Sequence, residues 1–172
     1  MILVGTAGFK FDDWKGRFYP PSLPDRDMLQ YYAGQFALLE IDYTYYTMPF
    51  AKTLDAMAKK VPADFVFCVK AHKSMTHEIP DNEEQLQSSF GSFNEALKPL
   101  VEQGKFGCIL VQFPWSCRPS DQSRDYIKSL PERYEGKSVV VEFRNRAWVS
   151  EETFSLLENS KLGYCCVDEP RL

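Results

Sequence analysis

Short apolar runs alternate with amphipathic stretches along the whole chain. Each run is stopped by glycine, proline or a polar residue, which is typical of a buried strand. The pattern predicts six strands, at residues 2–5, 37–42, 65–70, 106–112, 138–143 and 164–168. The stretches between them predict helices at residues 26–34, 53–60, 82–102, 121–130 and from 151 to about 161.

Capping and helix-breaking residues mark the ends of these helices. Asp25 and Ser150 stand where a side-chain oxygen can accept a hydrogen bond from the first turn of the helix that follows. Pro62 and Pro131 are expected to end the helices before them, because proline disfavours a helical conformation in the preceding residue. A loop rich in aromatic residues and proline, residues 9–24, follows the first strand.

Near-continuous apolar strands separated by helices indicate the α/β class, with a parallel sheet covered by helices. No strand is followed by the Gly-x-Gly-x-x-Gly sequence of a dinucleotide-binding fold. A (β/α) barrel of the TIM type is therefore the better interpretation. We find no internal repeat, low-complexity segment or linker, and we predict one domain over residues 1–172.

The number of strands bears on the completeness of the barrel. A full barrel has eight βα units and typically about 250 residues, whereas the pattern supplies six units in 172 residues. We therefore expect an incomplete barrel, truncated at its C-terminus, whose first and last strands lack one neighbour. Because open strand edges pair readily with other chains, we expect self-association that covers these edges.

Composition and charge exclude several classes of protein. The chain is 44% hydrophobic and 26% charged, as in ordinary globular domains. It lacks the roughly 18 consecutive apolar residues of a membrane span, and no basic region precedes its first apolar run, so we expect neither membrane insertion nor secretion. A net charge of −4 without a run of Lys or Arg argues against nucleic-acid binding. Five cysteines, with Cys165 and Cys166 adjacent, suit a reduced cytoplasmic protein.

Polar side chains follow the apolar part of every predicted strand. In chain order they are Thr6, Glu40, Asp42, Thr44, Lys70, His72, Gln112, Glu142, Arg144, Asp168 and Glu169. In a β/α barrel the C-terminal ends of the strands form the active-site face. Alternation along a strand would place Glu40, Asp42 and Thr44 on one face.

Charges in a strand core need partners, because burying an unpaired charge is costly. The carboxylates of Glu40, Asp42 and Glu142 are therefore expected to converge with Asp168 on Lys70 and Arg144. Ion pairs near the end of a barrel can also be purely architectural. The repetition of polar ends from strand to strand favours a functional site.

The two histidines, His72 and His77, follow the third strand. Neither belongs to a His-x-x-x-His or His-Glu-x-x-His pattern, so we predict no cofactor. A divalent metal held by these histidines with Glu142 and Asp168 stays an alternative. His77 alone could also act as an acid or base or face solvent. Cys117 lies in a loop, where no neighbour marks it as an activated nucleophile.

Aromatic residues form two further groups. The tyrosines within residues 43–46 and 31–32 are predicted to be core or helix-covering residues. Trp14, Phe18 and Tyr19 lie in the loop after the first strand, beside the expected mouth of the barrel. They could form an apolar wall or lid over a ligand.

The order of several motifs resembles the DUF72 (YecE-like) family, over essentially all 172 residues. The motifs are Gly5-Thr6-Ala7-Gly8-Phe9, Asp13-Trp14-Lys15-Gly16, Phe18-Tyr19-Pro20, the block from Glu40 to Tyr46, Lys70-Ala71 with Thr76-His77, Gln112-Phe113-Pro114, and Glu142-Phe143-Arg144 with Trp148. The resemblance implies a TIM barrel and a relation, by analogy, to sugar-isomerase-like barrels. It implies no defined activity, because the family is largely uncharacterised.

The resemblance also maps the family's motif residues onto this chain. They are Thr6, Trp14, Tyr19, Glu40, Thr44, Tyr46, Lys70, Thr76, His77, Gln112, Glu142, Arg144 and Trp148. The chain departs from the family pattern at Asp42, commonly Asn, and at Tyr45, commonly Phe. Family members also continue well beyond the Asp168-Glu169-Pro170 segment, through two more strands.

Three functions compete. The first is an enzyme, isomerase-like or hydrolase-like, acting on a small polar, carbohydrate-like or phosphorylated molecule. Glu40 or Glu142 would be its general base, Lys70 or His77 its acid or electrostatic stabiliser, and Arg144 an anion clamp. Expected substrate contacts are Thr6, Trp14, Tyr19, Asp42, Thr44, Tyr46, His72, Gln112, Arg144, Trp148 and Asp168.

The second function is non-catalytic binding of a small molecule or anion at the same mouth. The third is a metal-dependent hydrolase or nuclease-like barrel. Two histidines and a net charge of −4 support this third function least.

Overall fold

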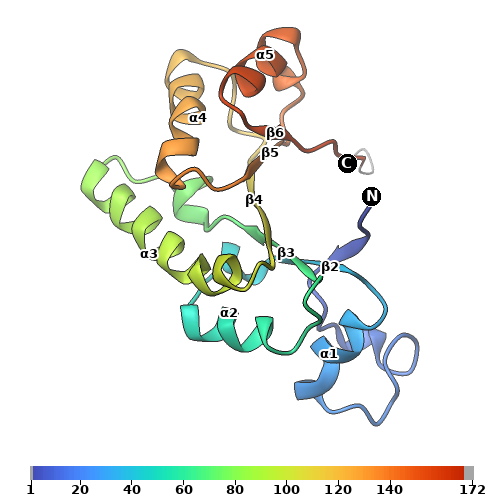
Figure 1. Ribbon diagram of the computed structural model, residues 1–172. Helices are drawn as coiled ribbons and strands as arrows, with labels where there is room; N and C mark the ends of the chain where they lie inside the picture. The colour runs from blue at the N-terminus through green and yellow to red at the C-terminus, as the bar shows by residue number, and fades with distance from the viewer. Residues whose placement is uncertain (1, 169–172) are drawn as a thin grey trace. The chain divides into compact units, whose positions relative to one another are not determined.

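The computed structural model describes residues 2–168 and has the α/β architecture predicted from the sequence (Figure 1). Its strands are β1 (Gly5–Ala7), β2 (Leu38–Ile41), β3 (Val66–Lys70), β4 (Phe106–Phe113), β5 (Val139–Phe143) and β6 (Gly163–Tyr164). Its helices are α1 (Met28–Ala33), α2 (Ala51–Ala58), α3 (Glu83–Glu102), α4 (Asp121–Arg133) and α5 (Glu151–Asn159).

The strands follow one another in chain order in a six-stranded sheet. Within the described residues, β1 pairs with β2, β2 with β3, β4 with β5 and β5 with β6, all in parallel. Parallel strands in chain order, joined by helices, are the βα units of a TIM-type barrel, six of the usual eight. The predicted fold class is confirmed, whereas self-association through the outer strands stays a prediction.

Two compact units make up the chain. The first unit comprises Met1–Lys70 with Glu95–Gly107, and the second comprises Ala71–Asn94 with Cys108–Leu172. Residues of α3 and of β4 therefore belong to both units. The expectation of a single domain over residues 1–172 stays a prediction.

In the first unit, β2 and β3 bury alternate residues. Leu39, Ile41, Phe67 and Val69 are at most 2% exposed, and together they form the apolar face of these strands. The alternate residues, among them Glu40, are half-buried. The alternation of apolar and polar positions along the strands therefore determines which face of the sheet presents polar and ionisable side chains.

In the second unit, aromatic rings from β4 and β5 pack against Trp148. Phe143 lies between Phe113 and Trp148, with ring centroids 5.9 Å and 4.5 Å away. The α4 and α5 helices lie side by side (Figure 1) and are joined by an ion pair between Arg124 and Glu152.

The first strand differs from its prediction. The apolar pattern predicts a buried strand at residues 2–5, but β1 is Gly5–Ala7, and Ile2 and Val4 are 91% and 62% exposed. Pairing with β2 starts at Gly5 opposite Leu38, so residues 2–4 have no partner on β2. Apolar character alone does not show where the neighbouring strand begins.

The last strand is shorter than predicted. β6 ends at Tyr164, and one further main-chain hydrogen bond joins Cys165 N to Val141 O at 2.8 Å. Asp168 is exposed and lies outside the strand, so it is not the polar end of β6. Glu169, the other polar residue predicted there, lies outside the described residues.

Two helix boundaries also differ. Asp25 does not cap α1: it starts a 3₁₀ turn, and its carboxylate pairs with Lys10 and Lys15. Pro131 lies inside α4 rather than after it. A proline removes one helical hydrogen bond, but near the C-terminus the following amides continue the bonding, with Tyr134 N donating to Leu130 O at 2.9 Å. The predicted cap at Ser150 is confirmed, since its side chain accepts from Thr153 N.

Candidate functional site

Two predicted acid/base residues share one face of the first unit. Glu40 lies opposite Cys68 in the register of β2 and β3, and Lys70 is two residues further along β3. All three are half-buried, on the opposite face from the apolar core. The Lys70 Nζ lies 5.4 Å from the centroid of the Tyr45 ring, a cation–π distance.

Thr44 does not share the face of Glu40. β2 ends at Ile41, and Tyr43–Tyr45 form a 3₁₀ turn, which interrupts the alternation expected along a strand. Thr44 is fully buried, with its Oγ1 at 2.9 Å from Ile41 O and 2.6 Å from Lys70 O. The hydroxyl therefore joins the C-terminal ends of β2 and β3 and is buried away from any ligand.

The tyrosines after β2 are not core residues. Tyr43 is 38% exposed and Tyr46 is 73% exposed, the latter resting edge-on against Tyr45 with centroids 4.8 Å apart. The core role is therefore wrong for Tyr43 and Tyr46, whereas a helix-covering role stays a prediction. Tyr32, by contrast, is buried as predicted.

The aromatic loop after β1 packs on its own rings and on the tyrosines of α1. Tyr19 is 1% exposed and donates a hydrogen bond to Phe9 O at 2.5 Å. Burial raises the pKa of Tyr19 to about 12. Trp14 is half-buried, with the rings of Phe18 and Tyr19 at 5.3 Å and 6.1 Å. Tyr19 thus has no surface for a ligand, and Phe18 and Tyr19 both pack against Tyr31 of α1.

Thr6 connects β1 to the helix that covers it. Its main-chain N–H donates to the Tyr32 hydroxyl at 2.8 Å, and its own hydroxyl donates to Gly8 O at 2.5 Å. The Tyr32 hydroxyl in turn donates to Leu38 O at 2.9 Å. Thr6 therefore holds the start of the loop, and substrate contact by this residue stays a prediction.

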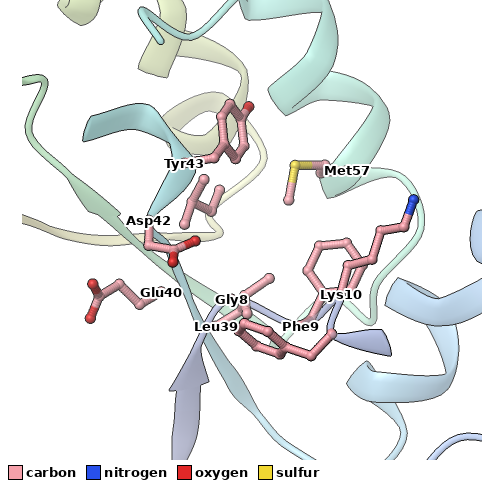
Figure 2. Close-up of a pocket in the computed structure, with 10 residues that line it drawn as sticks. Gly8, Phe9, Lys10, Leu39, Glu40, Asp42, Tyr43 and Met57 are labelled. Atoms are coloured by element: carbon pink, nitrogen blue, oxygen red, sulfur yellow. The ribbon is translucent and has the colours of Figure 1, made fainter. Parts of the chain in front are cut away.

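A pocket of about 290 Å³ opens beside Asp42 in the first unit (Figure 2). It is lined by Gly8, Phe9, Lys10, Phe11, Leu39, Glu40, Ile41, Asp42, Tyr43 and Met57. Sequence reasoning identified Glu40 and Asp42 but missed Phe9, Phe11 and Met57. The loop residues could have been found from their position directly after β1, whereas nothing in the helical pattern distinguishes Met57.

In the second unit, the predicted pairing of Glu142 with Arg144 is present at the end of β5. Arg144 Nε donates to Glu142 Oε1 at 2.6 Å, and the two side chains are 34% and 8% exposed. The other oxygen, Oε2, accepts a weak hydrogen bond from Cys165 Sγ at 3.7 Å. Gln112 lies opposite Glu142 in the register of β4 and β5. A buried carboxylate, a guanidinium and an amide are therefore gathered at the C-terminal ends of β4 and β5.

The histidines have local partners. His72 caps the 3₁₀ turn Lys73–Met75, its Nδ1 accepting from Ser74 N at 3.2 Å. The Nδ1 of His77 lies 2.9 Å from the hydroxyl of the buried Thr76. His72 therefore shapes the loop after β3, while His77 lines the larger cavity of the second unit.

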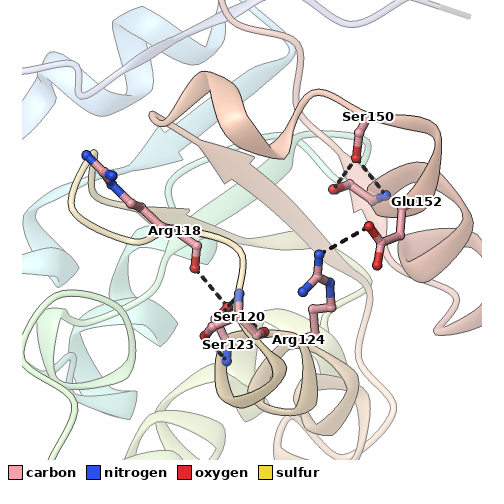
Figure 3. Close-up of polar contacts among 7 residues, drawn as sticks. Arg118, Ser120, Ser123, Arg124, Ser150 and Glu152 are labelled. Atoms are coloured by element: carbon pink, nitrogen blue, oxygen red, sulfur yellow. Dashed lines mark hydrogen bonds and ion pairs between the residues drawn. The ribbon is translucent and has the colours of Figure 1, made fainter.

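This larger cavity is a cleft of about 660 Å³ between the loop after β3 and the start of α4. His77, Cys117 and Arg118 line it. At its edge Ser120 and Ser123 cap α4 reciprocally, and Ser123 Oγ donates to Arg118 O at 2.9 Å (Figure 3). The Ser-x-x-Ser spacing at the start of α4 is the sequence signal that could have located this edge.

Trp148 is a packing residue. Its side chain is fully buried, stacks on Phe143, and donates from Nε1 to Cys117 O at 2.9 Å. A ligand cannot reach it in this structure.

Burial raises the pKa of the Cys117 thiol, which lines the cleft. Gln112 and Arg144 are the predicted ligand contacts that stay half-exposed beside Glu142.

Between residues 2 and 168, no three His, Cys, Asp or Glu side chains are arranged to hold a metal ion. No helix in that part of the chain is long and apolar enough to cross a bilayer.

Known proteins resemble this chain along its whole length. A family described as "Protein of unknown function DUF72" matches residues 3–172. The UPF0759 protein YunF of Bacillus subtilis (strain 168) is 30% identical over 183 residues, covering all of this chain and 62% of that protein.

Two solved structures have the same fold. A DUF72 family protein from Thermotoga maritima is 36% identical with a TM-score of 0.87, and this chain covers 66% of it. A DUF72 family protein from Enterococcus faecalis V583 is 23% identical with a TM-score of 0.83, and this chain covers 62% of it. The match includes 100% and 99% of this chain respectively, which therefore spans about two thirds or less of each relative's length.

Proposed function

Because this chain belongs to the DUF72 family, whose description names no function, its activity must follow from its own residues, and we propose an enzyme that binds a small polar anion beside Glu142 and Arg144. The substrate class is a carbohydrate-like or phosphorylated molecule. The reaction is acid/base chemistry, either isomerisation or hydrolysis.

The observation that supports this proposal is the geometry of the Glu142–Arg144 pair. A buried carboxylate is costly unless it is paired, and Arg144 supplies that pairing through Nε at 2.6 Å. The bond through Nε fixes the plane of the guanidinium. Because the Arg144 side chain is 34% exposed, a ligand can approach it from solvent.

A fixed guanidinium favours particular ligands. Its planar fork matches the oxygens of a carboxylate or phosphate, which it binds through two parallel hydrogen bonds. Gln112, on the adjacent strand, offers an amide of the kind that binds hydroxyl and carbonyl groups. Together the two side chains suit a molecule that carries both an anionic group and hydroxyls, as a sugar phosphate does.

Glu142 is the residue that supports proton transfer. A carboxylate has about four lone-pair sites, and Arg144 Nε and Cys165 Sγ occupy two of them. When a bound anion competes for the guanidinium, the carboxylate of Glu142 is positioned to accept a proton from the same ligand. Glu40 and Lys70, in the first unit, offer a carboxylate and an ammonium for the same class of chemistry.

The proposal is tested by substrate screening with the whole chain. Aldose and ketose phosphates, and the same sugars without phosphate, are screened by thermal shift, and ligands are then followed by NMR for conversion. We expect a phosphorylated ligand to stabilise the protein and to be converted. Stabilisation without conversion would instead establish the non-catalytic binding function.

Variants then assign the roles. Arg144→Ala should lower kcat/KM about 100-fold or more, as loss of an electrostatic donor does, and Glu142→Gln should lower kcat. Arg146→Ala is the matched control, since Arg146 is exposed two residues away. Turnover unchanged in both Arg144→Ala and Glu142→Gln would refute the proposal. Separate Glu40→Gln and Lys70→Met variants show whether these residues take part.

A further inference from the structure

The pocket beside Asp42 is distinct in its chemistry from the Glu142–Arg144 pair. It lies at the C-terminal ends of β1 and β2, with a volume of about 290 Å³. The loop from Gly8 to Phe11 forms one wall, residues 39–43 form another, and Met57 of α2 contributes a third. The function proposed above shares Glu40 with this pocket but does not use Asp42 or the aromatic lining.

Most of the lining is apolar and aromatic. Phe9, Phe11 and Tyr43 supply three rings, and Met57 supplies a polarisable thioether. Phe11 and Tyr43 are 40% and 38% exposed, so two of these rings reach the surface. Aromatic faces and methionine sulfur interact favourably with organic groups, and aromatic faces also attract cations.

Asp42 places one charge against this apolar lining. Its Oδ1 would lie 3.3 Å from a Cβ built on Gly8, so the carboxylate sits close to the main chain of that glycine. Figure 2 shows the Asp42 carboxylate turned toward the ring-lined side, whereas the Glu40 carboxylate points away. Asp42 is half-buried, precedes the 3₁₀ turn without capping it, and forms no ion pair or side-chain hydrogen bond within residues 2–168.

The basic residue of the lining, Lys10, is already paired with a carboxylate. The Lys10 Nζ pairs with Asp25 Oδ2 at 2.8 Å, and the same carboxylate raises the pKa of Lys10. In Figure 2 the amine of Lys10 extends away from Asp42, so the pocket meets its aliphatic stem. The lining therefore carries two carboxylates, Glu40 and Asp42, and Asp42 is the one that faces the rings.

We propose that this pocket binds a small organic ammonium ion. The Asp42 carboxylate would pair with the cationic nitrogen, and the rings of Phe9, Phe11 and Tyr43 would surround its carbon substituents. A half-buried carboxylate without a partner attracts a cation strongly, because the surrounding medium screens less than water does. The cavity volume is at the lower end for small-molecule sites, which suits an amine of a few carbons.

Other ligand classes fit less well. An anion would be repelled by Asp42, and a neutral molecule of the same shape would desolvate the carboxylate without replacing its water. A larger molecule would exceed the pocket unless it extended past the exposed rings of Phe11 and Tyr43. The charge of Asp42 and the volume together select a small cation.

The test is a titration of the full chain with three probes, n-butylammonium chloride, tetramethylammonium chloride and uncharged n-butanol, followed by NMR. We expect the two ammonium salts to shift resonances of residues 8–11, 39–43 and 57 specifically. Binding of n-butanol should be about tenfold weaker or more, because it lacks the charge that pairs with Asp42. Equal affinity for n-butylammonium and n-butanol, or no shifts with either salt, would overturn the proposal.

Variants distinguish the contribution of the Asp42 carboxylate to binding from that of the cavity. Asp42→Asn keeps the shape and removes the charge, and should weaken n-butylammonium binding about tenfold or more. Asp64→Asn, an exposed residue of the same unit, should bind as the wild type does. Met57→Trp fills the cavity and should abolish binding, which keeps the proposal testable if Asp42→Asn fails to fold. Unchanged affinity in either pocket variant would contradict the proposal.

Discussion

Arg144 donates a hydrogen bond from Nε to Oε1 of Glu142 across 2.6 Å, so that a buried carboxylate depends on a guanidinium side chain that is one-third exposed. Removing the guanidinium leaves the carboxylate of Glu142 buried without its charged partner. We expect Arg144→Ala to lower the free energy of unfolding by about 1–3 kcal/mol, the usual cost of an unsatisfied buried group. Urea unfolding of both proteins measures the difference.

The same pair offers an internal control. In the double variant Arg144→Ala with Glu142→Gln, the buried charge is gone, so part of the lost stability should return. Stability of Arg144→Ala equal to that of the wild type would show that water replaces the guanidinium at Glu142.

Lys105 is a buried lysine with a structural role. It is 8% exposed, and its Nζ donates to Ala58 O at 2.5 Å and to Val61 O at 2.9 Å, at the C-terminal end of α2. Lys105→Met should lower the free energy of unfolding by about 2–4 kcal/mol, because two carbonyls lose charge-assisted hydrogen bonds. Lys52→Met, on the exposed surface of α2, should change it by less than about 0.5 kcal/mol in the same urea experiment.

Ionisation of the Tyr19 hydroxyl makes the free energy of unfolding depend on pH in the alkaline range. Its pKa in the folded protein is raised from 10.0 to about 12 by burial. Between these values the unfolded chain has lost a proton that the folded chain still holds, so stability falls as pH rises. This contribution is complete below pH 10 and decreases as pH approaches 12.

Tyr19→Phe tests this dependence. The variant loses the hydrogen bond to Phe9 O and should be about 1 kcal/mol less stable than the wild type at pH 8. This difference in the free energy of unfolding should become smaller from pH 10 to pH 12, because only the wild type has the titrating hydroxyl. A constant gap, measured by urea unfolding at each pH, would contradict the assignment. Burial also raises the pKa values of Tyr126 and Tyr134, so some alkaline sensitivity persists in both proteins.

The strands and the Glu142–Arg144 pair could be predicted because both depend on local sequence. An apolar run bounded by turn residues forms a strand in almost any context. Side chains two residues apart on a strand point to the same face of the sheet. Opposite charges placed in this way pair with each other once the strand is buried. Arg144 lies one residue past β5, but its main-chain N–H still donates to Phe113 O at 3.3 Å, so the Glu142–Arg144 contact that period two implies is formed.

The predicted alternation of side chains between two faces is wrong beyond the end of β2. The sequence does not show that β2 ends at Ile41, because that boundary is set by pairing with β3, which is distant in sequence. Beyond it the chain turns, so Thr44 is buried against main-chain oxygens while Tyr46 is exposed. The same limit applies to Trp148, whose partner Cys117 O is 31 residues away. Contacts made by tertiary packing leave no periodic signal.

Gly5 occupies a position that excludes a side chain. A Cβ built there would overlap the main-chain carbonyl of Leu38, the residue opposite in β2. Backbone cannot move aside as a flexible side chain can, so Gly5→Ala should lower the free energy of unfolding by about 2 kcal/mol or more.

Gly91 is the matched control for this substitution. It lies within α3, and apart from the neighbouring residues and backbone of the helix itself no heavy atom lies within 4 Å of a Cβ built on it. Gly91→Ala should therefore raise stability by about 0.5–1 kcal/mol, because alanine favours the helix. If Gly5→Ala is as well tolerated as Gly91→Ala in urea unfolding, β1 does not approach β2 as closely as the register requires.

Cys117 and Cys166 should differ in reactivity toward alkylating reagents. Burial raises the pKa of the Cys117 thiol, which is half-buried, whereas Cys166 is exposed. Since the thiolate is the nucleophile, Cys117 should react with iodoacetamide at pH 8 about tenfold more slowly than Cys166 or slower still. Peptide mass spectrometry over a time course measures each rate. In urea the two rates should become similar, because unfolding removes the burial that distinguishes them. Equal rates in the folded chain would mean that the cleft admits reagent and water to Cys117 as freely as the surface does.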